Sequence, residues 1–206
     1  MGRIVALADA LAEENITVRH ICPGGGIGIK YKDEGTIDLD VYARALEASL
    51  ADRNVELLLE PGRVLVGNAG VLVSRVEYVK PTDSKNFLVI DAAMNDLIRP
   101  AMYGAHHDIV AVVEPSPGTE LQDYDIVGPV CETGDTFARA RPLPPLAEGD
   151  LMAFRSAGAY GAVMSSEYNT RPLIPEILVK GDQFAVIRAR PSFEEMINRD
   201  SIPIWL

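Results

Sequence analysis

The feature that most constrains the fold is a short apolar run that ends in four chemically distinctive residues. Residues 55–59 are Val-Glu-Leu-Leu-Leu, and Glu60, Pro61, Gly62 and Arg63 follow directly. A short apolar run after a helical pattern is typical of a strand buried on both faces of a parallel sheet. Glu60 and Arg63 then lie at the carboxyl end of that strand, where α/β barrels bind their ligands. A salt-bridged turn after a strand is the alternative, and this segment alone does not separate the two.

A glycine-rich loop upstream favours the ligand-binding interpretation. Residues 16–22 are rich in strand-forming residues and lead into Pro-Gly-Gly-Gly-Ile-Gly at residues 23–28. Consecutive glycines let backbone N–H groups converge on an anion, although a flexible turn is the simpler alternative. Residues 39–50 lie between the two loops and carry apolar side chains at helical spacing: Leu39, Tyr42, Leu46 and Leu50. The whole stretch predicts a βαβ unit with both loops on one side.

After residue 63 the sequence changes to short strand-like runs separated by turn-forming clusters, which is typical of an all-β barrel or sandwich. The predicted strands are residues 64–79, 87–91, 109–113, 125–130, 151–154, 177–179 and 184–188. Helical patches are predicted at residues 95–103 and 156–163, and a short helix at residues 193–197. A helical pattern of Ile4, Leu7 and Leu11 also predicts a helix at the start of the chain.

Composition narrows the classes of function. The 206 residues carry a net charge of −11, which disfavours nucleic acid and anionic membranes as partners. No stretch approaches the roughly 20 apolar residues of a transmembrane helix, and Asp9 interrupts the only run that resembles a signal peptide, so we expect a cytoplasmic protein. Cys22 and Cys131 lack metal-ligand spacing, and nothing completes a ligand set around His106 and His107. The sequence therefore predicts no disulfide framework and no metal site.

Four motifs in this order resemble the alanine-racemase-like group of pyridoxal-phosphate decarboxylases, which have fold type III. The motifs are the glycine run at residues 24–28, Glu-Pro-Gly-Arg at 60–63, Cys-Glu-Thr-Gly-Asp at 131–135 and Tyr-Gly-Ala at 160–162. The resemblance covers nearly the whole chain from Gly24 onward, and it implies a (β/α)8 barrel followed by a β-domain.

A full barrel needs roughly 250 residues, and this chain has far fewer before its β-rich part. We therefore expect a multi-domain α+β chain. Residues 1–62 are predicted to form the last βα units of an incomplete, cofactor-binding (β/α)8 barrel. Residues 63–206 are predicted to form a C-terminal all-β barrel or sandwich domain with short helices.

The resemblance implies pyridoxal 5'-phosphate as the cofactor and gives roles to particular residues. Glu60 is expected to face the pyridine nitrogen and keep it protonated, which makes the ring a better electron sink. The other expected cofactor contacts are Gly24, Gly25, Gly26, Gly62, Arg63 and Tyr160. The expected substrate contacts are Arg63, Arg99, Tyr103, Glu132 and Tyr160. Cys131 joins Glu60 as a catalytic residue, and Cys131 and Glu132 are expected to reach the neighbouring subunit's site in a homodimer.

The reaction implied by the resemblance is decarboxylation of meso-2,6-diaminopimelate to L-lysine, a step of lysine biosynthesis. The far end of this substrate carries an amine and a carboxylate, so its recognition takes an anion and a cation. Arg99 and Tyr103 can share a helical face and meet the carboxylate, while Glu132 can meet the amine. Relatives that act on ornithine typically have aspartate in place of Glu132. A decarboxylase of the ornithine, arginine or carboxynorspermidine type is the alternative within the family.

The lysine that forms the Schiff base in this family, and the histidine that stacks on its cofactor, match no segment of this chain. The sequence therefore predicts the C-terminal part of a decarboxylase, inactive when alone. A non-catalytic β-domain for dimerisation or regulation is the alternative from another class of protein. The intact charged motif residues favour the enzyme, because packing alone does not require a charged residue at a strand end.

Overall fold

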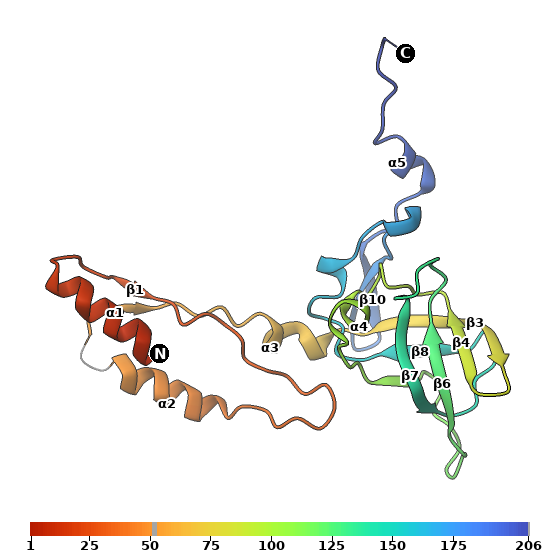
Figure 1. The fold of residues 1–206 in the computed structure, drawn as a ribbon, viewed down its shortest axis with the longest axis horizontal. Coiled ribbons are helices and arrows are strands. Elements are labelled where there is room, and N and C mark those ends of the chain that lie inside the picture. Colours follow the sequence, from red (N-terminus) through yellow and green to blue (C-terminus); the bar gives the residue numbers. More distant parts are fainter. Residues whose placement is uncertain (51–52, 206) are drawn as a thin grey trace.

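The chain folds into an elongated N-terminal part and a rounder part built on a curled sheet (Figure 1). The computed structural model describes residues 1–50 and 53–205. Within these residues, the N-terminal part holds two helices and two short strands, and the second part holds a six-stranded sheet. The last segment, from residue 193 onward, extends away from both parts (Figure 1).

The N-terminal part has the order helix, strand, helix, strand. Its elements are α1 (Gly2–Glu13), β1 (His20–Ile21), α2 (Leu39–Leu50) and β2 (Glu56–Leu57). The two strands pair in parallel, with Ile21 opposite Leu57. Ile21 is 2% exposed, and Leu46 of α2 is 6% exposed. Both predicted helices and the parallel pairing are confirmed, although the strands are shorter than the predicted ranges.

The apolar run at residues 55–59 is not buried on both faces. Leu58 is 44% exposed and Leu59 is 46% exposed. In the described part of the chain, the sheet here consists only of the β1–β2 pair. The predicted burial is therefore wrong for this chain, because an apolar side chain becomes buried only where a further strand or layer packs against it.

The six-stranded sheet carries the larger part of the structure. Its strands are β3 (Leu72–Pro81), β4 (Asn86–Ile90), β5 (Ile109–Ala111), β6 (Gln122–Val127), β7 (Thr136–Leu143) and β8 (Leu151–Phe154). Their order is β5-β8-β3-β4-β6-β7, with antiparallel neighbours except for the parallel pair β4 and β6. The sheet curls until it is nearly closed like a barrel (Figure 1), which confirms the predicted barrel-like sheet.

The remaining elements are short. A separate antiparallel hairpin consists of β9 (Glu176–Lys180) and β10 (Gln183–Arg188). The helices are α3 (Arg63–Val66), α4 (Arg99–Tyr103) and α5 (Phe193–Ile197), with 3₁₀ turns η1 (Gly67–Ala69), η2 (Ala162–Met164) and η3 (Tyr168–Thr170). A capping box of Ser192 and Glu195 begins α5, and this helix lies at the predicted residues 193–197. No helix within the described residues is long and apolar enough to cross a lipid bilayer.

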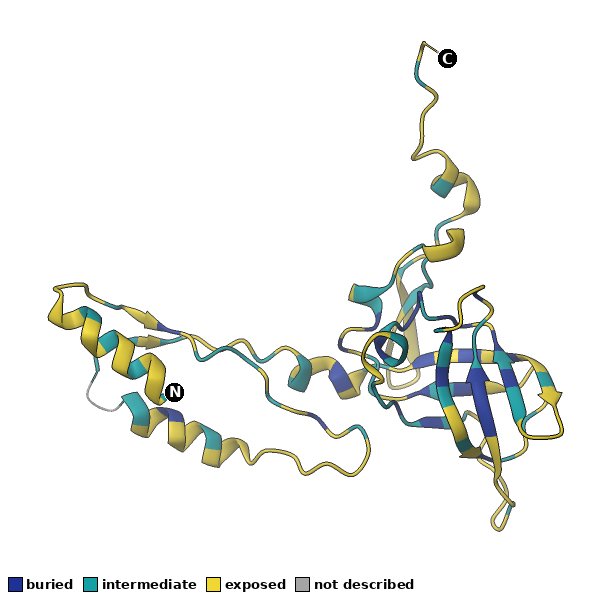
Figure 2. Ribbon diagram, in the orientation of Figure 1, coloured by how far each residue is buried: buried dark blue, intermediate teal, exposed yellow. Residues whose placement is uncertain are grey.

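The hydrophobic core lies inside the curled sheet. Buried residues gather there, whereas the N-terminal part and the C-terminal segment are mostly exposed (Figure 2). Val76, Leu88 and Phe154 are each fully buried, at 0% exposure. The rings of Phe137 and Phe154 pack with their centroids 4.8 Å apart. Buried residues recur at every second position along much of β3, β4 and β8, as the strand period of two residues predicts.

The sequence did not predict strand β7. Arg139, Arg141 and Pro142 make residues 136–143 polar and turn-like, yet Phe137 and Leu143 point into the core with exposures of 7% and 3%. The pairing of β6 with β7 shifts register along its length, and Ala140 has a φ of 44°. A bulge breaks the simple alternation of a strand, so the pattern was hidden.

Other predicted elements also differ in the structure. The helix predicted at residues 95–103 begins only at Arg99, and the strand predicted at residues 125–130 is β6, at Gln122–Val127. The predicted strand at residues 64–79 begins only at Leu72, because residues 63–69 form α3 and η1. A hydrogen bond from the Leu65 N–H to the Gly62 carbonyl, at 3.1 Å, stabilises the turn of the backbone here. The predicted helix at residues 156–163 is instead a series of turns that lead into η2. Glycines at residues 158 and 161 let this segment pass close to other backbone, which a regular helix would not allow.

Asp125 is a buried carboxylate that joins β6 to two other segments. Its Oδ2 accepts a hydrogen bond from Lys85 Nζ at 2.7 Å, and its Oδ1 accepts from the Ala140 N–H at 2.9 Å. The Asp125 side chain is 7% exposed. The hydrogen bond from Lys85, more than any other cause, holds the pKa of Asp125 below its usual range. The carboxylate therefore stabilises the bulged pairing of β6 and β7 in its charged form.

This ion pair predicts a loss of stability in acid. A carboxylate with a lowered pKa in the folded state stabilises the fold above its unfolded pKa of about 3.9, and that contribution is lost as the pH falls through the folded pKa. Asp125→Asn should lower the free energy of unfolding near pH 7 by about 1–3 kcal/mol. It should also make the fall in stability between about pH 5 and pH 3 shallower than in the wild type.

Urea unfolding across that pH range measures both effects. Asp123→Asn is the matched control, because Asp123 lies on the same strand with an exposed side chain. It should change the free energy of unfolding by less than about 0.5 kcal/mol. Parallel acid profiles for the wild type and Asp125→Asn would contradict this role of the ion pair.

Candidate functional site

The glycine-rich loop and the end of the second strand meet through their backbones. The Glu60 N–H donates a hydrogen bond to the Gly24 carbonyl at 3.3 Å. A Cβ atom placed on Gly25 would collide with the Glu60 carbonyl. Gly24 and Gly26 have φ angles of 83° and 80°, which suit glycine. The two predicted loops are thus side by side, and glycine at position 25 is what allows the contact.

The glycine-rich loop leaves several backbone donors available. The N–H groups of Gly25, Gly26 and Ile27 have no hydrogen-bond acceptor within the part of the chain that the structure describes. The Gly24 N–H donates to Cys22 Sγ at 3.3 Å. Free N–H groups on successive residues with glycine conformations suit an anion such as a phosphate. The donor set therefore fits the phosphate of pyridoxal phosphate.

A continuous set of close contacts leads from this loop to Tyr160. The Gly62 N–H donates to the Glu60 carbonyl at 2.9 Å, and Arg63 begins α3 directly afterwards. The Gly158 N–H donates to the Gly67 carbonyl at 3.0 Å, which holds the turn of Tyr160 against α3 and η1. Tyr160 is 45% exposed with a φ of 59°, a conformation that costs free energy in a residue with a side chain. No hydrogen bond joins it to the glycine-rich loop in the described residues.

Arg99 is a buried cation on α4. It is 8% exposed, and its Nη1 lies 3.0 Å from Nε2 of His107. Its Cζ lies 4.8 Å from the centroid of the Tyr31 ring. Tyr103, predicted to act with Arg99, is 63% exposed at the other end of the same helix. The structure brings Arg99 to the segment that follows the glycine-rich loop, and within the described residues no side-chain hydrogen bond or cation–π contact joins Arg99 to Tyr103.

Cys131 and Glu132 lie on an exposed loop between β6 and β7. The buried Asp135, which is 3% exposed, holds this loop in place. Its carboxylate accepts hydrogen bonds from the Met94 N–H at 2.7 Å and the Val130 N–H at 2.8 Å. Burial raises the pKa of Asp135, and the two backbone hydrogen bonds oppose that rise. Within the described residues, no hydrogen bond or ion pair joins this loop to Glu60, Arg63 or Arg99.

The sequence interpretation missed three residues that support the site. Asp135 was visible as the last residue of the Cys-Glu-Thr-Gly-Asp motif, but it received no role. Tyr31 follows the glycine-rich loop in an otherwise polar segment, and His107 was considered only as a metal ligand. In the described residues, no group of three or more histidine, cysteine, aspartate or glutamate side chains is arranged to hold a metal ion.

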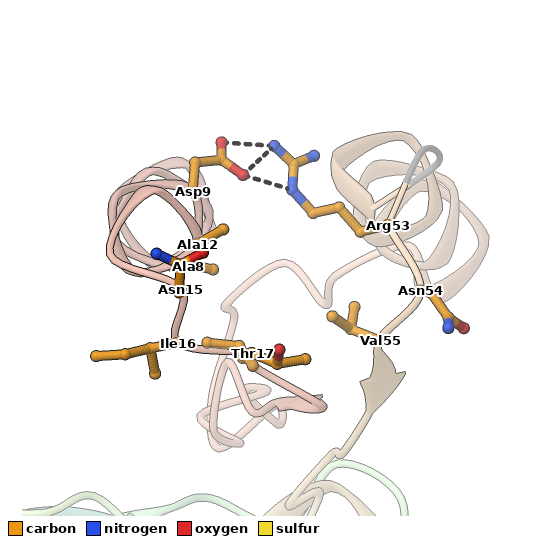
Figure 3. Close-up of a pocket in the computed structure, with 10 residues that line it drawn as sticks. Ala8, Asp9, Ala12, Asn15, Ile16, Thr17, Arg53, Asn54 and Val55 are labelled. Carbon is orange, nitrogen blue, oxygen red and sulfur yellow. Dashed lines mark hydrogen bonds and ion pairs between the residues drawn. The ribbon is translucent and has the colours of Figure 1, made fainter.

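Two cavities lie away from these residues. One of about 360 Å³ lies beside α1 at the starts of β1 and β2, the ends opposite Glu60 (Figure 3). Asp9 and Arg53 face each other across it, with Nη2 and Oδ2 2.7 Å apart. A larger cavity of about 1160 Å³ lies between the curled sheet and β9, with Arg171 and Arg190 in its lining. Neither is lined by a predicted site residue, so neither is the candidate site.

Residues 7–158 match the family described as "Pyridoxal-dependent decarboxylase, C-terminal sheet domain". The chain belongs to this family, which confirms the resemblance seen in the motifs. Among curated relatives, the diaminopimelate decarboxylase of Neisseria meningitidis serogroup A is 51% identical over 198 residues, covering 96% of this chain and 48% of the relative. The diaminopimelate decarboxylase of Pseudomonas aeruginosa is 50% identical over 202 residues, covering 98% of this chain and 48% of the relative.

A solved structure agrees with these relatives. Diaminopimelate decarboxylase from Helicobacter pylori complexed with L-lysine superposes with a TM-score of 0.88 at 37% identity, over 96% of this chain and 48% of that one. The chain thus spans about half the length of the proteins it matches.

The contact between Gly25 and Glu60 predicts a site-specific effect of a methyl group. Gly25→Ala should force the two loops apart, at an overpacking cost of about 1–3 kcal/mol. The Glu60 N–H, which donates to Gly24, should then exchange its hydrogen about 5- to 100-fold faster in hydrogen–deuterium exchange. Gly28→Ala is the matched control, because a Cβ at Gly28 would meet open space. Equal exchange rates in the two variants would show that the contact does not hold the loops together.

Proposed function

We propose that this chain is the C-terminal part of a pyridoxal-phosphate-dependent carboxy-lyase that converts meso-2,6-diaminopimelate to L-lysine in the cytoplasm. The observation that carries the proposal is the contact of the glycine-rich loop with the backbone of Glu60, which brings a loop with free N–H donors to a residue that carries a carboxylate. The names and the identity of the curated relatives support this substrate. The carboxylate of Glu132, where ornithine-type relatives have aspartate, favours diaminopimelate over ornithine.

Residues 1–62 supply the cofactor side of the site. When bound, pyridoxal phosphate supplies an electron sink for the carbon that loses carbon dioxide. The N–H groups of Gly25 and Gly26 would hold the phosphate, and Arg63 would add a positive charge. The N–H groups of Gly24 and Gly62 already donate to Cys22 Sγ and the Glu60 carbonyl, so these glycines would shape the turns beside the phosphate. Glu60 keeps a proton on the ring nitrogen. Tyr160, held against α3, closes this side of the site.

Substrate recognition comes from the sheet part. Arg99 is a buried cation without a carboxylate partner in the described residues, so it binds the carboxylate at the far end of diaminopimelate, with Tyr103 from the same helix. Glu132 binds the far amine, and Cys131 acts at the reacting end. We propose that Cys131 and Glu132 do so in the site of the partner subunit of a homodimer, since the loop that carries them is exposed.

Removing the far-end contacts should weaken substrate capture without affecting the binding of the cofactor. In the full-length protein of the reading frame that contains this chain, Arg99→Ala and Glu132→Ala should each lower kcat/KM for diaminopimelate. The loss should be about 30-fold to several thousand-fold, because a charged group on the substrate is left desolvated and unpaired at a cost of roughly 2–5 kcal/mol. Bound pyridoxal phosphate, measured by absorbance, should be unchanged. Glu60→Ala should instead lower kcat.

Arg44→Ala and Glu120→Ala are the matched controls, since both side chains are exposed and neither has a predicted role. Ornithine, offered as a substrate, has no carboxylate at its far end, so the wild type should turn it over far more slowly than diaminopimelate. Equal rates on the two substrates would favour the ornithine-type alternative. Intact diaminopimelate turnover in Arg99→Ala would remove this residue from the substrate site.

The isolated 206-residue chain should release no carbon dioxide from diaminopimelate. The family's reactive lysine has no match here, so the chain holds the cofactor only through its phosphate and ring nitrogen. Carbon dioxide release from labelled diaminopimelate, with pyridoxal phosphate added, measures this. The full-length protein is the positive control, and a silent full-length protein would favour the non-catalytic β-domain. Turnover by the purified chain alone would contradict the inference that the reactive lysine lies outside these 206 residues.

A further inference from the structure

Arg99 is a buried cation, and a neutral side chain, not a carboxylate, accepts its side-chain hydrogen bond. The acceptor of its Nη1 is His107 Nε2, at 3.0 Å. No aspartate or glutamate oxygen within the described residues forms an ion pair with Arg99. Burying a guanidinium without an opposite charge costs free energy, so an anion bound beside Arg99 would stabilise it.

His107 has one consistent arrangement of protons. Its Nδ1 lies 2.9 Å from the carbonyl oxygen of Arg155, which can only accept, so Nδ1 carries a proton. A guanidinium can only donate, so Nε2 keeps its lone pair for Arg99. His107 is 2% exposed, and this burial is the main reason why its pKa is lowered. The hydrogen bond to the Arg155 carbonyl raises the pKa, and the charge of Arg99 lowers it. His107 is therefore a neutral acceptor in a fixed orientation.

Tyr31 supports the other face of the same group. Its ring centroid lies 4.8 Å from Arg99 Cζ and 5.6 Å from the His107 ring, which it meets edge to face at 82°. The Tyr31 hydroxyl is buried without a hydrogen-bond partner in the described chain, so the contact depends on the aromatic ring. Because Tyr31 follows the glycine-rich loop, its ring also couples that loop to α4.

We propose that His107 and Tyr31 are positioning residues that hold Arg99 as an uncompensated cation for the carboxylate at the non-reacting end of the substrate. This inference rests on the proposed decarboxylase function. A neutral acceptor on one side and an aromatic face on the other orient the guanidinium but do not cancel its charge. A carboxylate in the place of His107 would orient it equally well and would compete with the substrate.

The product presents the same group to Arg99. Decarboxylation breaks the bond to one carboxylate, which leaves as carbon dioxide, and the carbon that lost it takes up a proton. The carboxylate at the other end stays on L-lysine. L-lysine therefore probes the site without turnover, and cadaverine, which has the same chain and amines but no carboxylate, is its matched control.

Calorimetric binding of L-lysine and cadaverine to the cofactor-loaded, full-length protein tests the role of His107. His107→Phe keeps a ring but removes the acceptor, so it should weaken L-lysine binding about 10- to 100-fold and leave cadaverine binding unchanged. It should raise KM for diaminopimelate by a similar factor while kcat changes less than about threefold. His107→Gln restores an acceptor oxygen and should stay within about threefold of the wild type.

The Tyr31 pair gives a second and independent comparison. Tyr31→Phe keeps the ring and loses only an unpartnered hydroxyl, so L-lysine binding should not change. Tyr31→Leu removes the aromatic face and should weaken L-lysine binding about 3- to 10-fold, again without a change for cadaverine. This pair decides the question if His107→Phe does not fold.

Two results would overturn the positioning role. One is an equal loss of L-lysine and cadaverine binding in His107→Phe or Tyr31→Leu, which would show that these residues only support the fold. The other is L-lysine affinity in both variants equal to that of the wild type. A wild type that releases no carbon dioxide would refute the proposed function separately, and the L-lysine and cadaverine comparison would still decide whether His107 and Tyr31 position Arg99.

Discussion

The backbone contact between Gly25 and Glu60 is the constraint on which the candidate site depends. It exists because position 25 has no side chain, so the first loop can lie against the carbonyl at the end of the second strand. The loop with the free N–H groups lies beside the end of β2, and Glu60 and Arg63 follow that strand closely in the chain. A βαβ unit with longer loops or a bulkier residue at position 25 would separate these groups.

The parts of the fold that could be predicted are those that a short window of sequence specifies. Helices α1 and α2 have apolar residues at helical spacing, and β8 alternates between clear turn clusters. Strand β7 could not be found this way, because its bulge at Ala140 breaks the alternation and is stabilised by Asp125, a residue distant in sequence. The burial of residues 55–59 was predicted wrongly for a different reason. Burial depends on what packs over a strand, and in the described chain only β1 pairs with it.

The residues of the candidate site also fall into those that the local sequence predicts and those that it does not. The positions of Gly25 and Glu60 followed from local sequence, since each belongs to a motif with its own chemistry. The roles of Asp135, Tyr31 and His107 depend on tertiary contacts between segments that no periodicity relates: Asp135 with Met94, and Tyr31 with both Arg99 and His107. A tyrosine after a glycine-rich loop is ordinary until the structure shows a buried guanidinium over its ring.

The uneven distribution of buried residues gives the site a further physical property. The curled sheet has its own core, whereas few residues of the N-terminal part are buried (Figure 2). Among the described residues of that part, the buried apolar ones are Ile21, Ile29 and Leu46. The glycine-rich loop and Glu60 thus lie on the weakly packed part, and Arg99 lies on the strongly packed part. The stacking of Tyr31 on Arg99 connects the two parts, so the position of the guanidinium depends on the segment that follows the glycine-rich loop. In the proposed site, one aromatic ring therefore joins the segment after the glycine-rich loop to the cation that we propose for the substrate.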